Sequence, residues 1–224
     1  MRIVCISASN TVAKGDKSAS VMVCGKISEL ILREKPEATV ENLPLQDCAL
    51  VPCTLCGACC NTGQCPFDMA FNRVLSAIEQ ADGIFFVVPH YSPIPSKLMI
   101  LFEKINEIAY SNWLVRPEYR CAFRGTPVGV VGHGGMVGTE ENLKYYHDHL
   151  VTPVANTLRS LSFQVIGVGD EYKNGAVFGL RDENCLVKTE HSVFPDIVQD
   201  WPAIVKGIEP LVQNVLAAVG AGKA

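Results

Sequence analysis

The sequence predicts an α/β fold in which a parallel sheet is covered by helices on both faces. The alternation of two kinds of segment supports this prediction. Short, wholly apolar segments such as residues 3–6 and 83–88 alternate along the chain with longer amphipathic segments. Continuous apolar runs are typical of strands buried on both faces, and the helices between them serve as crossovers. No repeat and no flexible linker divides the 224 residues, so we expect a single domain spanning residues 1–224.

The first half of the chain gives three strands and three helices. We expect strands at residues 2–7, 38–43 and 83–88, and helices at about residues 18–34, 67–80 and 97–109. The first helix has apolar positions at helical spacing and stops before Pro36, which cannot continue a helix. The second helix repeats this spacing, and Pro89 ends the apolar third strand.

The second half continues the alternation with strands expected at residues 127–131 and 163–168. A long helix is expected at residues 139–161, with a bend at Pro153, and a last helix at about residues 200–218. Pro202 and Pro210 are possible interruptions of that last helix. Residues 175–187 have the character of a hairpin with its turn near residues 182–184. We therefore expect a C-terminal extension of hairpin and helix over about residues 170–224.

Composition excludes several functional classes. The chain is 48% hydrophobic and 19% charged, which is typical of a globular domain with a large core. Its net charge of −4 gives no electrostatic footprint for nucleic acid. No apolar run reaches about 18 residues and no signal peptide is recognisable at the start, so we expect neither a membrane span nor export. Ten cysteines without an export signal indicate a reducing cytoplasm.

One loop, residues 47–66, follows the second expected strand, and half of the ten cysteines lie in its stretch 52–66. Their spacing is C-x2-C-x2-C-x5-C, with Cys60 left over; the four spaced residues are Cys53, Cys56, Cys59 and Cys65. Four thiolates so arranged can surround a small inorganic cluster, which is the ligation that an iron–sulfur cubane requires. Three alternatives remain open: a zinc site, disulfides, and a loop of free thiols.

Three further loops follow the first, third and fourth strands, where ligands bind in open parallel sheets. Residues 7–17 are polar and precede a helix N-terminus, which favours phosphate through free backbone N–H groups. Neither a P-loop nor a dinucleotide fingerprint is present, so a mononucleotide phosphate is the better interpretation. Residues 89–95 carry three prolines and Tyr91, suited to a flat ring, and residues 132–138 carry four glycines that allow close backbone approach. Each loop alone has an ordinary structural explanation. The prediction of a ligand site depends on all three loops lying at the same edge of the sheet.

Four motifs together give the chain a resemblance to a known family. They are Ser7-Ala8-Ser9 after the first strand, the cysteine run, Ala81-Asp82-Gly83-Ile84 leading to Pro89-His90-Tyr91, and Gly132-His133-Gly134-Gly135. Over about residues 1–170 the sequence resembles the iron–sulfur flavoproteins, a branch of the NADPH-dependent FMN reductase group. The resemblance implies a flavodoxin-like three-layer sandwich with a five-stranded parallel sheet of order 2-1-3-4-5.

The resemblance also implies the cofactors and their residues. It implies a [4Fe–4S] cluster on Cys53, Cys56, Cys59 and Cys65. It implies FMN phosphate at Ser7, Ser9, Asn10 and Ser18. It implies isoalloxazine contacts from Pro89, His90, Tyr91, Ser92, Pro93 and Ile94, and from Gly132, His133, Gly134 and Gly135. It further implies a homodimer or homotetramer.

We therefore expect a cytoplasmic, FMN-dependent oxidoreductase that passes electrons between a [4Fe–4S] cluster and FMN. NAD(P)H or a ferredoxin-like protein would be the electron donor. No general acid or base stands out, and His90 and His133 fit hydrogen-bonded structural histidines better than catalytic ones. One alternative is an NAD(P)H-dependent FMN or quinone reductase without a functional cluster. Another is a thiol-based redox or metal-sensing module.

Overall fold

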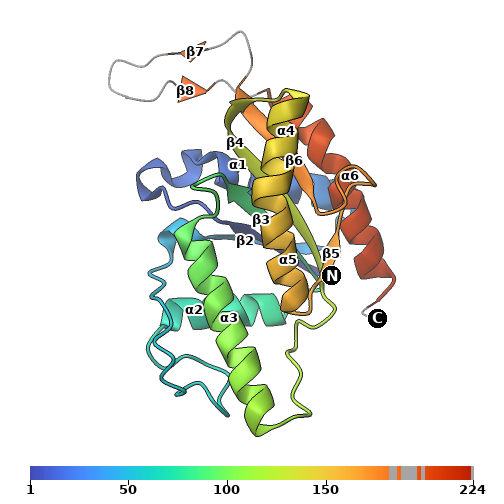
Figure 1. Ribbon diagram of the computed structural model, residues 1–224. Coiled ribbons are helices and arrows are strands. Elements are labelled where there is room, and N and C mark those ends of the chain that lie inside the picture. The colour runs from blue at the N-terminus through green and yellow to red at the C-terminus, as the bar shows by residue number, and fades with distance from the viewer. Residues whose placement is uncertain (182–185, 188–195, 198–199, 223–224) are drawn as a thin grey trace.

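The computed structural model describes residues 1–181, 186–187, 196–197 and 200–222 (Figure 1). Its centre is a parallel sheet of order β2-β1-β3-β4-β5, with β6 also paired to β4. The strands are β1 (Arg2–Ser7), β2 (Thr39–Pro44), β3 (Gly83–Pro89), β4 (Pro127–Val137), β5 (Gln164–Ile166) and β6 (Ala176–Arg181). The predicted α/β class and strand order are confirmed, and the sheet has one strand more than expected.

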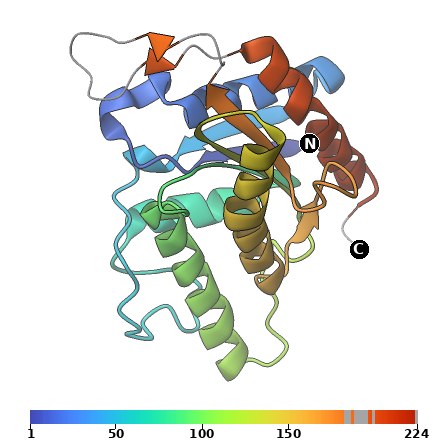
Figure 2. The same ribbon diagram turned by 45° about the horizontal axis from the view of Figure 1, so that its top comes forward.

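Helices cover both faces of this sheet (Figures 1 and 2). The helices are α1 (Ala19–Glu34), α2 (Met69–Glu79), α3 (Ser96–Val115), α4 (Glu140–Tyr146), α5 (Thr152–Ser160) and α6 (Trp201–Gly220). Two short 3-10 helices, η1 (Val12–Lys17) and η2 (Leu45–Asp47), follow β1 and β2. Helices α1 and α6 lie against one face, and α2, α3 and α5 against the other.

The apolar runs of the sequence divide between these two layers. Successive side chains of a strand point to opposite faces, so Ile3 and Cys5 of β1 pack with α1 and α6. Val4 and Ile6 face α2 and α3. Every residue of β3 is buried, as expected for a central strand covered on both sides.

The long helix expected at residues 139–161 is interrupted before Pro153. A π-helical turn, η3 (His147–Val151), joins α4 to α5 without a loop. Proline lacks the N–H that would continue the ordinary hydrogen-bond ladder, and a single π-helical turn inside the helix accommodates that loss here. The predicted bend therefore takes the form of a wider turn just ahead of the proline.

The prediction of a glycine loop after residue 131 is wrong, because β4 continues to Val137. Two strands pair with successive parts of β4 where one was expected. Strand β5 pairs with residues 127–129 of β4, and β6 pairs with β4 from Val131 onward. Gly132 and Gly134 allow η3 and α4 to lie close to this strand. A Cβ at Gly132 would lie 2.4 Å from Val151, and one at Gly134 would lie 2.2 Å from the Tyr146 hydroxyl.

The C-terminal extension is only partly as expected. Residues 176–181 join the main sheet as β6, and the turn expected near residues 182–184 lies outside the described residues. A two-stranded antiparallel ladder joins β7 (Leu186–Val187) and β8 (Asp196–Ile197). Helix α6 runs through Pro210 without interruption. In the described chain it is the one helix long and apolar enough to cross a membrane by length and composition, but Leu211 and Val215 are buried against the sheet.

Candidate functional site

The loops after β1 and β3 meet at the carboxyl edge of the sheet. The Tyr91 hydroxyl lies 2.9 Å from Thr11 Oγ1 and 3.4 Å from Ser9 Oγ. A second link joins the same loops, because Asn10 Nδ2 donates to Ser96 Oγ at 3.2 Å. The two segments that the sequence assigned to one site are therefore neighbours in the fold.

The first loop surrounds the N-terminus of α1 with polar groups. Ser18 is the N-cap residue of α1, but its hydroxyl makes no capping hydrogen bond. Across the part of the chain that the structure describes, the buried Ser7 hydroxyl and Asn10 Oδ1 have no hydrogen-bond partner. Lys14 and Lys17 lie in η1 beside this terminus. Free backbone N–H groups, hydroxyls and two cations together suit a phosphate group.

A tight turn holds the second loop in place. The backbone N–H of Tyr91 donates to the Pro93 carbonyl at 2.7 Å, and Ser92 between them has a φ of 58°. The N–H of His90 donates to the carbonyl of His133 at 2.8 Å, which anchors the loop to β4. Tyr91 is 38% exposed, so its ring is accessible at the edge of the sheet.

The side chain of His133 is part of the core. It is buried, its Nε2 lies 2.8 Å from Ser20 Oγ, and its ring stacks on Phe178 with centroids 5.2 Å apart. Burial lowers the pKa of His133 to about 3, so the ring is neutral near pH 7. The expected structural role of this histidine is confirmed, while its backbone remains at the edge where a ligand is predicted.

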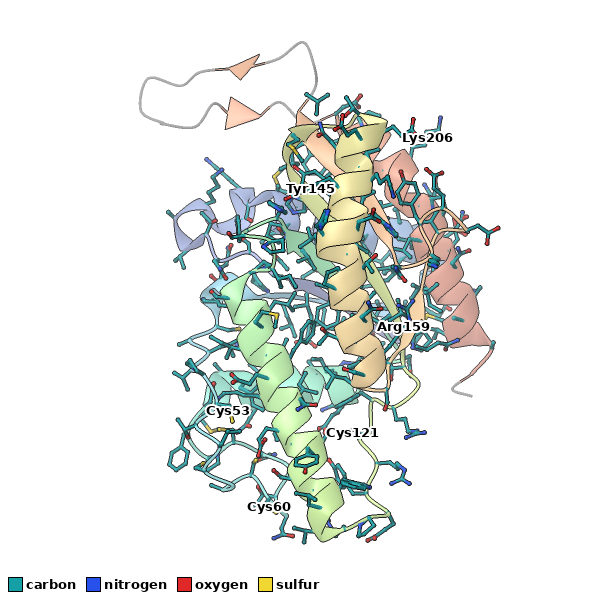
Figure 3. All side chains as sticks on the ribbon, in the orientation of Figure 1. Cys53, Cys60, Cys121, Tyr145, Arg159 and Lys206 are labelled. Carbon is teal, nitrogen blue, oxygen red and sulfur yellow. The ribbon has the colours of Figure 1, made fainter. Side chains whose placement is uncertain are left out.

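An aromatic cluster that the sequence analysis did not assign flanks His90. His90 Nε2 lies 3.3 Å from the hydroxyl of Tyr145, which is labelled in Figure 3. The ring centroids of Tyr145 and His149 are 4.8 Å apart. Burial, together with the neighbouring His149, lowers the pKa of His90. The i, i+4 spacing of Tyr145 and His149 was the available signal, since it places both on one helix face.

The cysteine loop forms a second candidate site between α2 and α3. A pocket of about 110 Å³ is lined by all four spaced cysteines, Cys53, Cys56, Cys59 and Cys65. Cys60 is not among the lining residues; its thiol points to the Ser111 carbonyl at 3.5 Å, farther along α3 (Figure 3). Nowhere in the described residues are three or more His, Cys, Asp or Glu side chains placed to hold a metal ion.

The pocket thiols have different surroundings. The backbone N–H of Ala58, helped by Thr54, lowers the pKa of the exposed Cys56 thiol. Burial raises the pKa of Cys59. Of these two thiols, Cys56 more readily provides a thiolate, which is the form that binds metals and reacts with oxidants.

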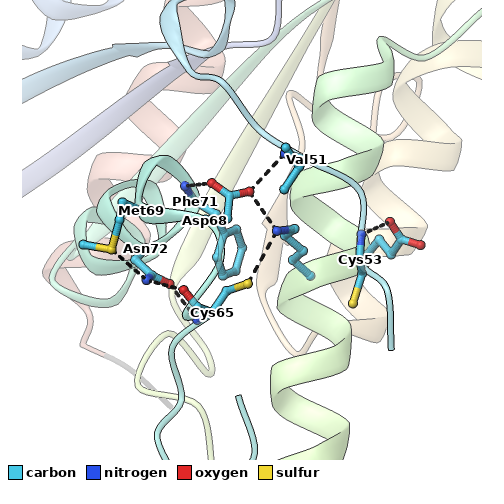
Figure 4. Close-up of polar contacts among 9 residues, drawn as sticks. Val51, Cys53, Cys65, Asp68, Met69, Phe71 and Asn72 are labelled. Atoms are coloured by element: carbon cyan, nitrogen blue, oxygen red, sulfur yellow. Dashed lines mark hydrogen bonds and ion pairs between the residues drawn. The ribbon is translucent and has the colours of Figure 1, made fainter. Parts of the chain in front are cut away.

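A buried ion pair supports one wall of this pocket (Figure 4). Lys104 Nζ on α3 lies 2.7 Å from Asp68 Oδ2 and 3.7 Å from Cys65 Sγ. Asp68 also caps α2 by accepting from the N–H of Phe71, and it accepts from Val51 N. Burial alone would raise the pKa of Asp68, but these hydrogen bonds, led by that of Lys104, hold it below its usual value.

Comparison with known proteins decides the family. A family model described as NADPH-dependent FMN reductase matches residues 1–166. The chain belongs to the NADPH-dependent FMN reductase family. It is therefore a flavin-dependent NAD(P)H oxidoreductase, and the flavin of the family is FMN. No curated protein matches the chain.

Solved structures share the fold of this FMN reductase family member at low sequence identity. RosB with a bound 8-demethyl-8-formylriboflavin-5'-phosphate intermediate is 13% identical to this chain, with a TM-score of 0.62. The match covers 99% of this chain and 79% of the RosB chain. An oxidoreductase from Corynebacterium diphtheriae is 12% identical, with 98% and 97% covered and a TM-score of 0.54. An azoreductase from Bacillus anthracis str. Sterne is 14% identical, with 99% and 98% covered and a TM-score of 0.51. At these identities the likeness shows the flavodoxin-like fold alone.

Proposed function

We propose that this reductase binds one FMN across the loops after β1 and β3 and reduces it with NAD(P)H. The observation that carries the proposal is the link of Tyr91 to Thr11 and Ser9 beside the N-terminus of α1. The accessible ring of Tyr91 lies next to hydroxyl groups of the loop that we propose as the phosphate site. Bound FMN would supply the hydride and single-electron chemistry that side chains lack.

The phosphate end of this proposed site is the α1 N-terminus. Ser7, Ser9 and Ser18 would donate hydroxyl hydrogen bonds, and the Asn10 side chain would close the loop over them. The loop is held from behind, because Gln46 Nε2 donates to the Gly15 carbonyl at 3.0 Å. These contacts would position the ligand before any electron transfer takes place.

The ring end would lie along the second loop and the end of β4. We propose contacts from Pro89, His90, Tyr91, Ser92, Pro93 and Ile94, and from the backbone of Gly132, His133, Gly134 and Gly135. The His133 side chain is packed in the core and its carbonyl accepts from the N–H of His90, so contacts at this end would come from backbone groups that lie beyond the end of β3. Backbone N–H groups at this edge would favour the anionic, reduced flavin.

Anaerobic titration of the FMN-loaded protein with NADPH tests this proposal. We expect loss of the oxidised flavin's visible absorption at one equivalent of NADPH, and its return on addition of a quinone. If NADPH and NADH both leave the spectrum unchanged while dithionite bleaches it, the protein uses another donor. A ferredoxin-like protein would then be the next donor to test.

The cysteine pocket favours a second candidate function, electron transfer through a [4Fe–4S] cluster. The chemistry of the donor set suits such a group, because four thiols line one pocket and Cys60 points elsewhere, although among the described residues no three of them are already placed around a metal ion. Helix α3 connects the two proposed sites. Ser96 at its start contacts Asn10 of the loop after β1, and Lys104 lines the cysteine pocket. Eight residues of helix separate them by about 12 Å along its axis.

Purification without oxygen, followed by iron, sulfide and flavin analysis, separates the candidates. About four iron and four sulfide per chain would support electron transfer between cluster and FMN. FMN with no iron would leave the simple reductase, and thiols that change reversibly with oxidant but hold neither group would favour a sensor. Sizing the same sample would test the proposed homodimer or homotetramer. A reducing cytoplasm would keep the nine described thiols free, as the structure has them.

A further inference from the structure

Lys104 occupies an unusual position in the cysteine pocket. It is 3% exposed, and among the described residues that line the pocket it is the one cation. Its ammonium donates to Asp68 at 2.7 Å and to the Cys65 thiol at 3.7 Å, and it lies 5.4 Å from the centre of the Phe71 ring. A lysine with three donors thus has one aimed at a sulfur of the proposed ligand set.

Stability alone does not explain this buried pair. Removing two charges from water costs more than their attraction returns in many proteins, and apolar residues of similar size often do as well. The other charges nearby are negative: Glu107 lines the pocket, and Glu103 accepts from the N–H of Cys53 at 3.2 Å. Four thiolates here would add to that negative charge, so a cation at this wall has an electrostatic use.

We propose that Lys104 sets the charge of the cysteine pocket and raises the reduction potential of a thiolate-bound iron–sulfur centre held there. This rests on the proposed cluster. Reduction of such a centre by one electron would add one negative charge to the pocket. The ammonium beside Cys65 stabilises that added charge directly, and Asp68 holds the ammonium in place while partly opposing its effect. Lys104 is therefore a positioning and tuning residue, with no bond to the metal.

Removing the charge of Lys104 or of Asp68 tests this proposal, because the two changes should shift the reduction potential in opposite directions. In Lys104→Met the carboxylate of Asp68 remains alone, so the potential should fall. In Asp68→Asn the ammonium is unopposed, so the potential should rise. Asparagine caps a helix as well as aspartate does, which preserves the start of α2. The double variant carries neither charge, and its reduction potential should lie between those of the wild type and Lys104→Met.

The measurement is a redox titration of the anaerobically reconstituted protein, followed by electron paramagnetic resonance. We expect the equilibrium constant for reduction to fall at least tenfold in Lys104→Met, which is 59 mV for a one-electron couple. Lys97→Met is the matched control. Lys97 lies on α3 seven residues earlier and donates to the Leu45 and Gln46 carbonyls, so its loss should leave the potential unchanged.

Two outcomes overturn the inference in distinguishable ways. If the wild type holds the cluster but both single variants shift the potential in the same direction, or neither shifts it, Lys104 is purely structural and the proposed electron transfer survives. If the reconstituted wild type holds no iron and sulfide, the cluster and the inference both fall. Should Lys104→Met fail to fold, Asp68→Asn and the neutral double variant still decide the question.

Discussion

The hydroxyl of Tyr91 lies 2.9 Å from Thr11 Oγ1, although 80 residues separate them in the chain. This contact joins the loop after β1 to the loop after β3. The position of the Tyr91 ring is therefore set by the same loop that carries the proposed phosphate contacts. A ligand with a phosphate at one end and a flat ring at the other would contact both loops at once.

The first prediction concerns the phosphate end. Replacing Ser9 and Ser18 together with alanine removes two hydroxyl donors, and each hydrogen bond to a charged group is worth about 1.5–3 kcal/mol. FMN affinity should fall at least about tenfold, measured by quenching of flavin fluorescence. The control pair Ser76→Ala and Ser160→Ala removes hydroxyls from α2 and α5 and should leave affinity as it is. If the Ser9/Ser18 variant and the control variant bind FMN with the same affinity, the phosphate binds elsewhere.

The second prediction concerns Gly134. In Gly134→Ala the new methyl group would lie 2.2 Å from the Tyr146 hydroxyl, so the helix or the strand must move. We expect a loss of about 1–3 kcal/mol in the free energy of unfolding, which is typical of overpacking. Gly25→Ala is the matched control, because nothing lies within 4 Å of a Cβ there and alanine favours its helix. Equal stability of the two variants would show that Gly134 is not a packing residue.

The third prediction concerns pH. The pKa of His133 is lowered by burial to about 3, whereas an unfolded histidine titrates near 6.5. Between these values the unfolded state holds the additional proton, so the free energy of unfolding falls as pH falls. The contribution of one proton is at most about 1.4 kcal/mol per pH unit. His133→Asn should flatten the pH dependence of urea unfolding across this window, and an unchanged slope would contradict the assignment.

The fourth prediction separates the cysteines of the loop. Cys60→Ser should leave the iron and sulfide content of the anaerobic protein unchanged, because its thiol points away from the pocket to Ser111. Cys56→Ser and Cys59→Ser should lower that content, with flavin binding largely retained since the flavin loops are separate. Loss of iron in the Cys60 variant and retention in the Cys59 variant would reverse the ligand assignment.

Much of the fold could be predicted because its signals are local. The apolar run of β3 and the helical spacing in α2 depend on neighbouring residues, and both elements lie where expected. The extension of β4 to Val137 could not be predicted, because it depends on pairing with β6, which follows about 40 residues later. Glycines that suggested a loop are there because Val151 and Tyr146 pack against them.

The candidate sites likewise have one part that the sequence predicts and another part that depends on distant helices. The strand-end rule brought Ser9 and Tyr91 together correctly, since strand order fixes which loops meet. The partners from distant helices, Tyr145 beside His90 and Lys104 beside Cys65, could not be predicted. Nothing in the local sequence of α3 or α4 indicates which loop each helix faces.

The identity and amount of flavin in the purified protein test the proposed FMN site most directly. Heat should release one FMN per chain, identified by chromatography against FMN and FAD standards. Release of FAD, or no flavin even after incubation of the protein with FMN, would contradict a mononucleotide flavin site at the carboxyl edge of this sheet.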